Sequence, residues 1–101
     1  THATFSSTAE TSLIGAGGAG VFRDITHLTF TNESTSATVE VVLSASSGSA
    51  STGYRYLLAE RGGIDMDFTR TLQQGTANSN WVVTLQTAVT VDAVVTWENN
   101  V

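Results

Sequence analysis

The stretch N-W-V-V-T-L-Q-T-A-V-T-V-D-A-V-V-T-W-E-N, residues 80–99, decides the fold. Its apolar residues recur at every second position, and mostly Thr, Gln, Asp and Glu lie between them. Successive side chains of a β-strand leave opposite faces of the sheet, so this period of two is typical of half-buried strands. The stretch predicts two strands that turn near Thr87 and Ala88. The residues expected to face inward are Trp81, Val83 and Leu85 in the first strand, and Val89, Val91, Ala93, Val95 and Trp97 in the second.

The rest of the chain shows the same pattern, and no segment carries a helical stripe of apolar residues. We expect further strands at residues 4–7, 11–14, 21–32, 38–45, 54–60 and 64–72, with Gly- and Ser-rich turns between several of them. About eight short strands at this spacing predict an all-β fold, a two-sheet antiparallel β-sandwich that is jelly-roll-like. An immunoglobulin-like sandwich is the alternative. Residues 1–101 form a single domain, with residues 1–11 as an N-terminal arm.

Two details of this pattern make sharper predictions. Within residues 21–32, apolar residues occupy both odd- and even-numbered positions. This mixed parity indicates a β-bulge, a bend or burial on both faces. The alternation also predicts a set of side chains that are buried between the sheets: Val39, Val41, Leu43, Ile64, Phe68, Leu85, Val91 and Val95.

The composition excludes several classes of function. The chain has no Cys, no Pro and no Lys, and its formal net charge is −5. Without Cys there is no thiol catalysis and no thiolate metal site. The negative electrostatic potential of such a chain repels phosphates, so we expect no nucleic-acid partner and no attraction to anionic membranes. No apolar run is long enough to cross a bilayer, and the opening residues show no signal-peptide pattern.

Three patterns that can signal chemistry have simpler explanations here. The glycines at 15, 17 and 20 fit G-x-G-x-x-G, but a strand rather than a helix is expected after them, which favours an inter-strand loop. Asp65 and Asp67 share one face of a strand and, with Glu60 or Asp92, raise the question of Ca²⁺ binding. Their alternation with Thr favours a solvated face.

The two histidines and a glycosylation sequon are the remaining candidate features, and neither predicts a catalytic site. His2 and His27 are the two histidines, and we expect His27 on the outer face of a strand or at a sheet edge rather than in a triad. Asn32-Glu33-Ser34 matches a glycosylation sequon, and we interpret it as a turn. We therefore expect no enzyme activity, no cofactor and no metal.

Aromatic residues supply the candidate binding surface. Tyr54, Tyr56, Trp81 and Trp97 fit either a carbohydrate-stacking shelf or, for the two tryptophans, burial in the core or a subunit interface. With residues of the N-terminal arm they make up the predicted interface set: His2, Phe5, Tyr54, Tyr56, Trp81 and Trp97.

The order of these segments resembles the small jelly-roll virion proteins of tailed bacteriophages. The resemblance rests on T-S-L-I, A-G-V-F-R-D-I-T-H-L-T-F-T-N, S-A-T-V-E-V-V-L-S-A, a Gly-containing hairpin and the closing W-V-V-T-L…V-T-W segment. It implies a head decoration (cement) protein that stabilises the capsid shell from outside. The implied partners are the major capsid protein and copies of the chain itself, as a homotrimer, and the implied location is the virion exterior after synthesis in the host cytoplasm. A carbohydrate- or receptor-binding module of a tail or fibre is the alternative.

Overall fold

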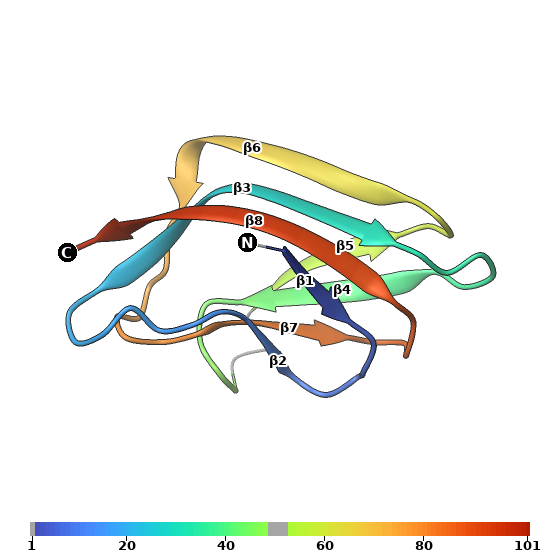
Figure 1. Ribbon diagram of the computed structural model, residues 1–101, viewed down its shortest axis with the longest axis horizontal. Helices are drawn as coiled ribbons and strands as arrows, with labels where there is room; N and C mark the ends of the chain where they lie inside the picture. Colours follow the sequence, from blue (N-terminus) through green and yellow to red (C-terminus); the bar gives the residue numbers. More distant parts are fainter. Residues whose placement is uncertain (1, 49–52) are drawn as a thin grey trace.

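The computed structural model describes residues 2–48 and 53–101, and within them all regular structure is β-strand. The described part therefore contains no helix that is long and apolar enough to span a membrane. Eight strands are present in these residues (Figure 1). They are β1 (His2–Phe5), β2 (Thr11–Ile14), β3 (Phe22–Asn32), β4 (Val39–Ser44), β5 (Tyr54–Leu58), β6 (Gly63–Leu72), β7 (Trp81–Leu85) and β8 (Val91–Asn100).

The strands form two antiparallel sheets of four. Sheet A has the order β1-β8-β3-β6, and sheet B has the order β2-β7-β4-β5. In Figure 1 sheet A runs from β6 at the top through β3 and β8 to β1. The chain alternates between the sheets from β1 to β4, and again from β5 to β8, so that β1 lies beside β8 and β2 beside β7. This is the strand order of a jelly roll, which confirms the predicted all-β sandwich.

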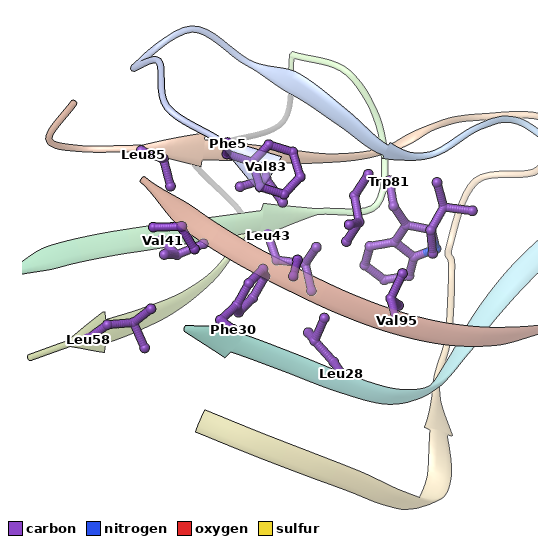
Figure 2. Close-up of a cluster of buried hydrophobic side chains, with 14 of the residues drawn as sticks. Phe5, Leu28, Phe30, Val41, Leu43, Leu58, Trp81, Val83, Leu85 and Val95 are labelled. Carbon is purple, nitrogen blue, oxygen red and sulfur yellow. The ribbon is translucent and has the colours of Figure 1, made fainter. Parts of the chain in front are cut away.

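The core lies between the two sheets and is built from the inward face of each (Figure 2). The structure confirms six of the residues that the alternation predicts to be buried: Val39, Val41, Leu43, Leu85, Val91 and Val95. The prediction is wrong for Ile64 and Phe68, which pack against the core but remain partly exposed. The reason is topological: β6 is the outermost strand of sheet A, so its inward face is covered from one direction only.

Strand β3 contains a bulge, one of the three explanations predicted for its mixed pattern. Ile25, Leu28 and Phe30 are all fully buried, although Ile25 and Leu28 are three residues apart. The pairing with β8 steps from Ile25–Trp97 to His27–Thr96, so Thr26 is the additional residue on β3. Its hydroxyl lies 2.8 Å from the hydroxyl of Thr96. A bulge of one residue restores the inward direction for the second half of the strand.

The predicted N-terminal arm joins the sandwich through strand β1 and, at its last residue, Thr11, through strand β2. Strand β1 starts at His2 rather than at Thr4, and it pairs with β8 from His2–Val94 to Phe5–Val91. Phe5 is buried in the core, and Thr1 lies outside the described residues. Burial of Phe5 and the ladder to β8 offset the ordering entropy of this segment. A strand of the same chain, not a neighbouring subunit, therefore holds it.

The turn after β3 is anchored by one buried amide. Asn32 is fully buried, and its Nδ2 donates hydrogen bonds to the carbonyls of Ala37, Leu58 and Ala59, at 2.9, 3.4 and 3.1 Å. Its Oδ1 accepts from the backbone N–H of Ser34 at 3.0 Å, which is an Asx turn. The sequon pattern is thus confirmed as a turn, and its amide connects β3 to the β5–β6 connection.

Candidate interaction surfaces

The outer face of sheet A presents a polar surface across all four strands, which we call the polar face. Its central row runs from His2 on β1 through Val94 on β8 and Thr29 on β3 to Asp65 on β6, as the strand register dictates. Rows on either side complete the face. They consist of Thr4, Asp92 and Thr31 on one side, and Thr96, His27 and Asp67 on the other.

Hydrogen bonds and ion pairs fix the β3–β6 part of the polar face. The Nε2 of His27 lies 2.7 Å from Asp65 Oδ1, and its Nδ1 lies 3.6 Å from Asp67 Oδ1. The hydroxyl of Thr29 also donates to Asp65 Oδ1, at 2.8 Å. His27 therefore lies on the outer face of its strand, as predicted. Two carboxylates, those of Asp65 and Asp67, thus flank its ring.

A second cluster lies at the β1–β8 end of the polar face. Thr4 donates its hydroxyl proton to Asp92 Oδ1 at 2.8 Å, and His2 Nε2 lies 3.7 Å from the same oxygen. The bond from Thr4 lowers the pKa of Asp92, and the bond shared with Glu33 lowers it further. Glu33 shows the opposite effect, because its hydrogen bond to Asp92 and the charge of Asp92 raise its pKa.

Metal ligation at Asp65 and Asp67 has no supporting geometry. In residues 2–48 and 53–101, no group of three or more His, Asp or Glu side chains converges on a common point. The two aspartates turn towards the ring of His27 instead. The glycine run connects β2 to β3, and in place of a helix N-terminus it packs against Val21 and Arg23, which confirms the inter-strand loop.

Both tryptophans contribute to the core, Trp81 within it and Trp97 packed against it. Trp81 is fully buried, and its Nε1–H donates to the carbonyl oxygen of Arg23 at 2.6 Å. Trp97 is partly buried, with the guanidinium carbon of Arg23 5.6 Å from its ring centroid. Arg23 also donates from its side chain to the carbonyl of Gly15 and the side chain of Asn99. The prediction of core burial is confirmed for Trp81, and a shelf with both tryptophans is excluded.

The predicted interface set is dispersed by the fold. His2 lies on the polar face, whereas Phe5 and Trp81 are in the core. Tyr56 is partly buried, with its ring centroid 5.9 Å from that of Phe30, and burial raises the pKa of its hydroxyl. Tyr54 remains 45% exposed at the start of β5. Of the six residues, His2 and Tyr54 are thus the ones that offer substantial surface to a partner.

A second candidate surface lies where β5 and β6 form the outermost strands of the two sheets, which we call the open side. Leu57 of β5 is 73% exposed, the highest value for a large apolar side chain within any described strand. Sequence analysis did not single it out, although Leu57-Leu58 breaks the alternation of β5. Partly exposed core-facing residues continue the open side behind it, namely Tyr56, Ile64, Met66 and Phe68.

The outer face of sheet B is covered at β4 and β7. Val42 and Val82 lie on this face, because they alternate with core residues, yet both are buried. The chain passes directly over Val42 at Gly53, where an added Cβ would lie 2.7 Å from a Val42 methyl carbon. The Gly48 N–H donates to the carboxylate of Glu10 nearby, at 3.0 Å. The exposed large apolar side chains of the described strands therefore lie on the polar face, at Val94, and on β5, at Tyr54 and Leu57.

The chain matches no protein-family profile, no curated protein and no solved structure.

Proposed function

We propose that the protein is a non-enzymatic structural protein that decorates the outside of a tailed-phage head and binds the major capsid protein through its polar face. One observation carries the proposal: hydrogen-bonding side chains of four neighbouring strands lie on one face around an exposed apolar centre. Val94 at that centre is 44% exposed, with His2 and Thr29 on either side of it. An apolar centre with a polar rim is the usual anatomy of a protein–protein contact.

The rigidity of the polar face favours a binding role. Its side chains stand on paired strands, and several already hydrogen-bond to one another, so little side-chain entropy remains to be lost on binding. Threonine adds hydrogen bonding with one stiff side-chain torsion. The net charge of −5 also keeps the protein away from packaged DNA.

The fold is compatible with this role. Double-sheet jelly rolls occur in viral capsid domains and in lectins, so the strand order supports a binding or structural role by analogy. The sequence resemblance to small phage virion proteins then favours the capsid exterior over other locations. Each decoration subunit would add a modest contact, and the symmetry of the shell would multiply it into avidity.

A binding experiment with purified heads tests the proposal. Heads that lack the protein, from the phage that encodes it, should retain added protein through sedimentation up to a saturating copy number. Val94→Arg places a long cation at the centre of the polar face and should weaken retention at least about tenfold. Thr35→Arg, in the exposed turn after β3, is the matched control and should bind as wild type does. Failure of wild-type protein to bind, or wild-type retention of Val94→Arg, would overturn the proposal.

A carbohydrate-binding role is the second candidate, and one observation favours it. Tyr54 borders a surface hollow together with Arg70, Thr71 and Gln73, which combines an exposed aromatic ring with hydrogen-bond donors. This is the residue combination that stacks on and orients sugars. Binding of the protein to a glycan array that is lost in Tyr54→Ala but retained in Val94→Arg would favour this role over capsid decoration.

A further inference from the structure

We infer that a hollow at one end of the polar face, built around the carboxylate of Asp24, binds the ammonium group of a lysine side chain from a protein partner. The inference deepens the proposed function and rests on it for the identity of that partner as the capsid protein. Three features support it: the burial of Asp24, the lining of the hollow and its place on sheet A.

Asp24 is a buried carboxylate without a cation beside it. It is 3% exposed, and it is the one charged side chain among the buried residues that the structure describes. Its Oδ1 accepts from the backbone N–H of Gln74 at 2.9 Å, and its Oδ2 accepts from Asn100 Nδ2 at 3.3 Å. None of the ion pairs in the described part of the chain includes Asp24. A carboxylate has about four acceptor positions and a buried charge is costly until it is paired, so Asp24 can still accept a charged donor.

The four arginines of the chain are placed elsewhere. The guanidinium of Arg23 donates to a carbonyl of the β2–β3 connection and to a side chain of β8. Arg55 pairs with Glu40, and Arg61 lies in the turn before β6, at the opposite end of that strand. Arg70 lines a neighbouring hollow instead. The chain contains no Lys, so an ammonium group in the hollow comes from another molecule.

The hollow suits an ammonium group on an aliphatic stem. Its volume is about 230 Å³, and it is lined by Phe22, Asp24, Gln73, Gln74, Gly75 and Asn100. Small-molecule pockets measure roughly 300–1,000 Å³, so this one fits a single side chain better than a sugar chain. An ammonium group can donate to Asp24 and to the amide oxygen of Asn100, while its stem lies against the ring of Phe22. Ca²⁺ fits less well, because it takes about six to eight oxygen ligands and no group of three His, Asp or Glu side chains converges within the described residues.

Gln74 holds the hollow in shape. It is 2% exposed, and its Oε1 accepts from the backbone N–H of Arg23 at 2.8 Å. Its Nε2 donates to the carbonyls of Ala45 and Ser79, at 3.0 and 2.7 Å. Because the backbone N–H of this fixed residue holds Asp24, the carboxylate loses little freedom when it binds a cation.

The strand register places the hollow at one end of the polar face. Along β8, Thr96 of the polar face is followed on the same side by Glu98 and Asn100. Glu98 is exposed and lies directly opposite Asp24 in the β3–β8 ladder, at the end where β8 finishes and β3 begins (Figure 1). Its carboxylate adds negative charge beside the hollow, which favours a cation over an anion. A protein that covers the polar face can thus reach the hollow with one long side chain.

NMR titration of the free protein tests the inference without any capsid. The probe is N-acetyl-lysine amide, and the control is N-acetyl-norleucine amide, which has the same carbon chain without the ammonium group. The lysine probe should give saturable shifts of the Gln74, Gly75 and Asn100 backbone amides, and the norleucine control should give none. Asp24→Asn keeps an oxygen for the Gln74 N–H and should weaken binding of the probe at least about tenfold. Glu60→Gln, in the exposed turn before β6, removes the same charge and should bind as wild type does. A wild type that does not bind the probe, or an Asp24→Asn variant that binds it equally well, contradicts the inference.

A second variant blocks the hollow without altering its carboxylate. A Cβ added at Gly75 would meet no atom within 4 Å, so Gly75→Leu should fold and should exclude the probe by its bulk. Undiminished binding to Gly75→Leu would place the cation elsewhere on the surface and refute the inference. Binding that appears only in Arg70→Gln would show that the chain's own arginine fills the hollow, with the same consequence.

Retention on heads then tests the identity of the partner. Asp24→Asn should weaken retention at least about tenfold, and Glu60→Gln should leave it unchanged. Full retention of Asp24→Asn would show that the capsid protein places no lysine in the hollow, against the inference. A wild type that binds the lysine probe but not heads would refute the proposed function and leave the ammonium site intact. A wild type that binds heads but not the probe would refute the inference alone.

Discussion

The two lateral sides of the sandwich differ in how completely they bury their apolar side chains. On one side, which we call the closed side, the outermost strands β1 and β2 bring Phe5, Leu13 and Ile14 into the core, and all three are buried. On the open side, β5 and β6 leave Tyr54 and Leu57 exposed and Phe68 half covered. Both sides end in strands of the same jelly roll. An outermost place in a sheet leaves the inward face of a strand open on one side, and the side chains of that strand then decide whether the face is buried within one chain.

The comparison teaches where stability and binding reside. A complete side contributes to folding, because its apolar surface is removed from water within the monomer. An incomplete side retains apolar surface whose burial can contribute to association instead. The difference between the two sides can be tested by matched truncations and by the titration of the closed side's carboxyl groups.

The largest effect is expected from truncation on the closed side. Phe5→Ala removes a buried aromatic ring and leaves a cavity between β1 and the core, which should cost about 3–5 kcal/mol of unfolding free energy. Urea denaturation followed by tryptophan fluorescence measures it. A cost below about 1 kcal/mol would show that β1 is not an integral strand, and that the closed side is held in some other way.

A smaller effect is expected from the matched truncation on the open side. Phe68 is only partly buried, so Phe68→Ala should cost about 1–2 kcal/mol. The same urea denaturation measures it. If Phe68→Ala proves as costly as Phe5→Ala, the open side is complete in the monomer and the distinction between the two sides fails.

The smallest effect concerns the charges beside β1. Asp92 raises the pKa of Glu33, so Asp92→Asn should lower the folded-state pKa of Glu33 towards its ordinary value. In the wild type, the raised pKa of Glu33 disfavours the folded state above that pKa, and this cost vanishes as the pH falls through it. The lowered pKa of Asp92 acts oppositely: its stabilisation is lost as the pH falls below the ordinary Asp range. NMR titration of the Glu33 carboxyl carbon measures the change, and an unaltered midpoint would exclude the coupling.

Periodicity was sufficient for the strands and for most of the core. The alternation in β4, β7 and β8 depends on local backbone geometry, so Val41, Leu85 and Val95 could be placed from the chain alone. Mixed parity indicated a bulge, a bend or two-sided burial within residues 21–32, and the structure shows a bulge at Thr26. The candidate site was harder to predict. Trp81 and Tyr54 carry similar sequence signals, but one is in the core and the other is on the surface, because their strands occupy an inner and an outer place in sheet B.

Four apolar doublets mark the boundary between what the chain determines locally and what depends on its folding. Val41-Val42, Leu57-Leu58, Val82-Val83 and Val94-Val95 each break the alternation and so place one apolar side chain on an outer face. That much follows from the amino-acid order, because a strand has only two faces. Val42 and Val82 are covered, whereas Val94 and Leu57 are exposed. Segments distant in sequence cover an outer face or leave it bare, so tertiary structure alone decided which of these side chains are available to a partner.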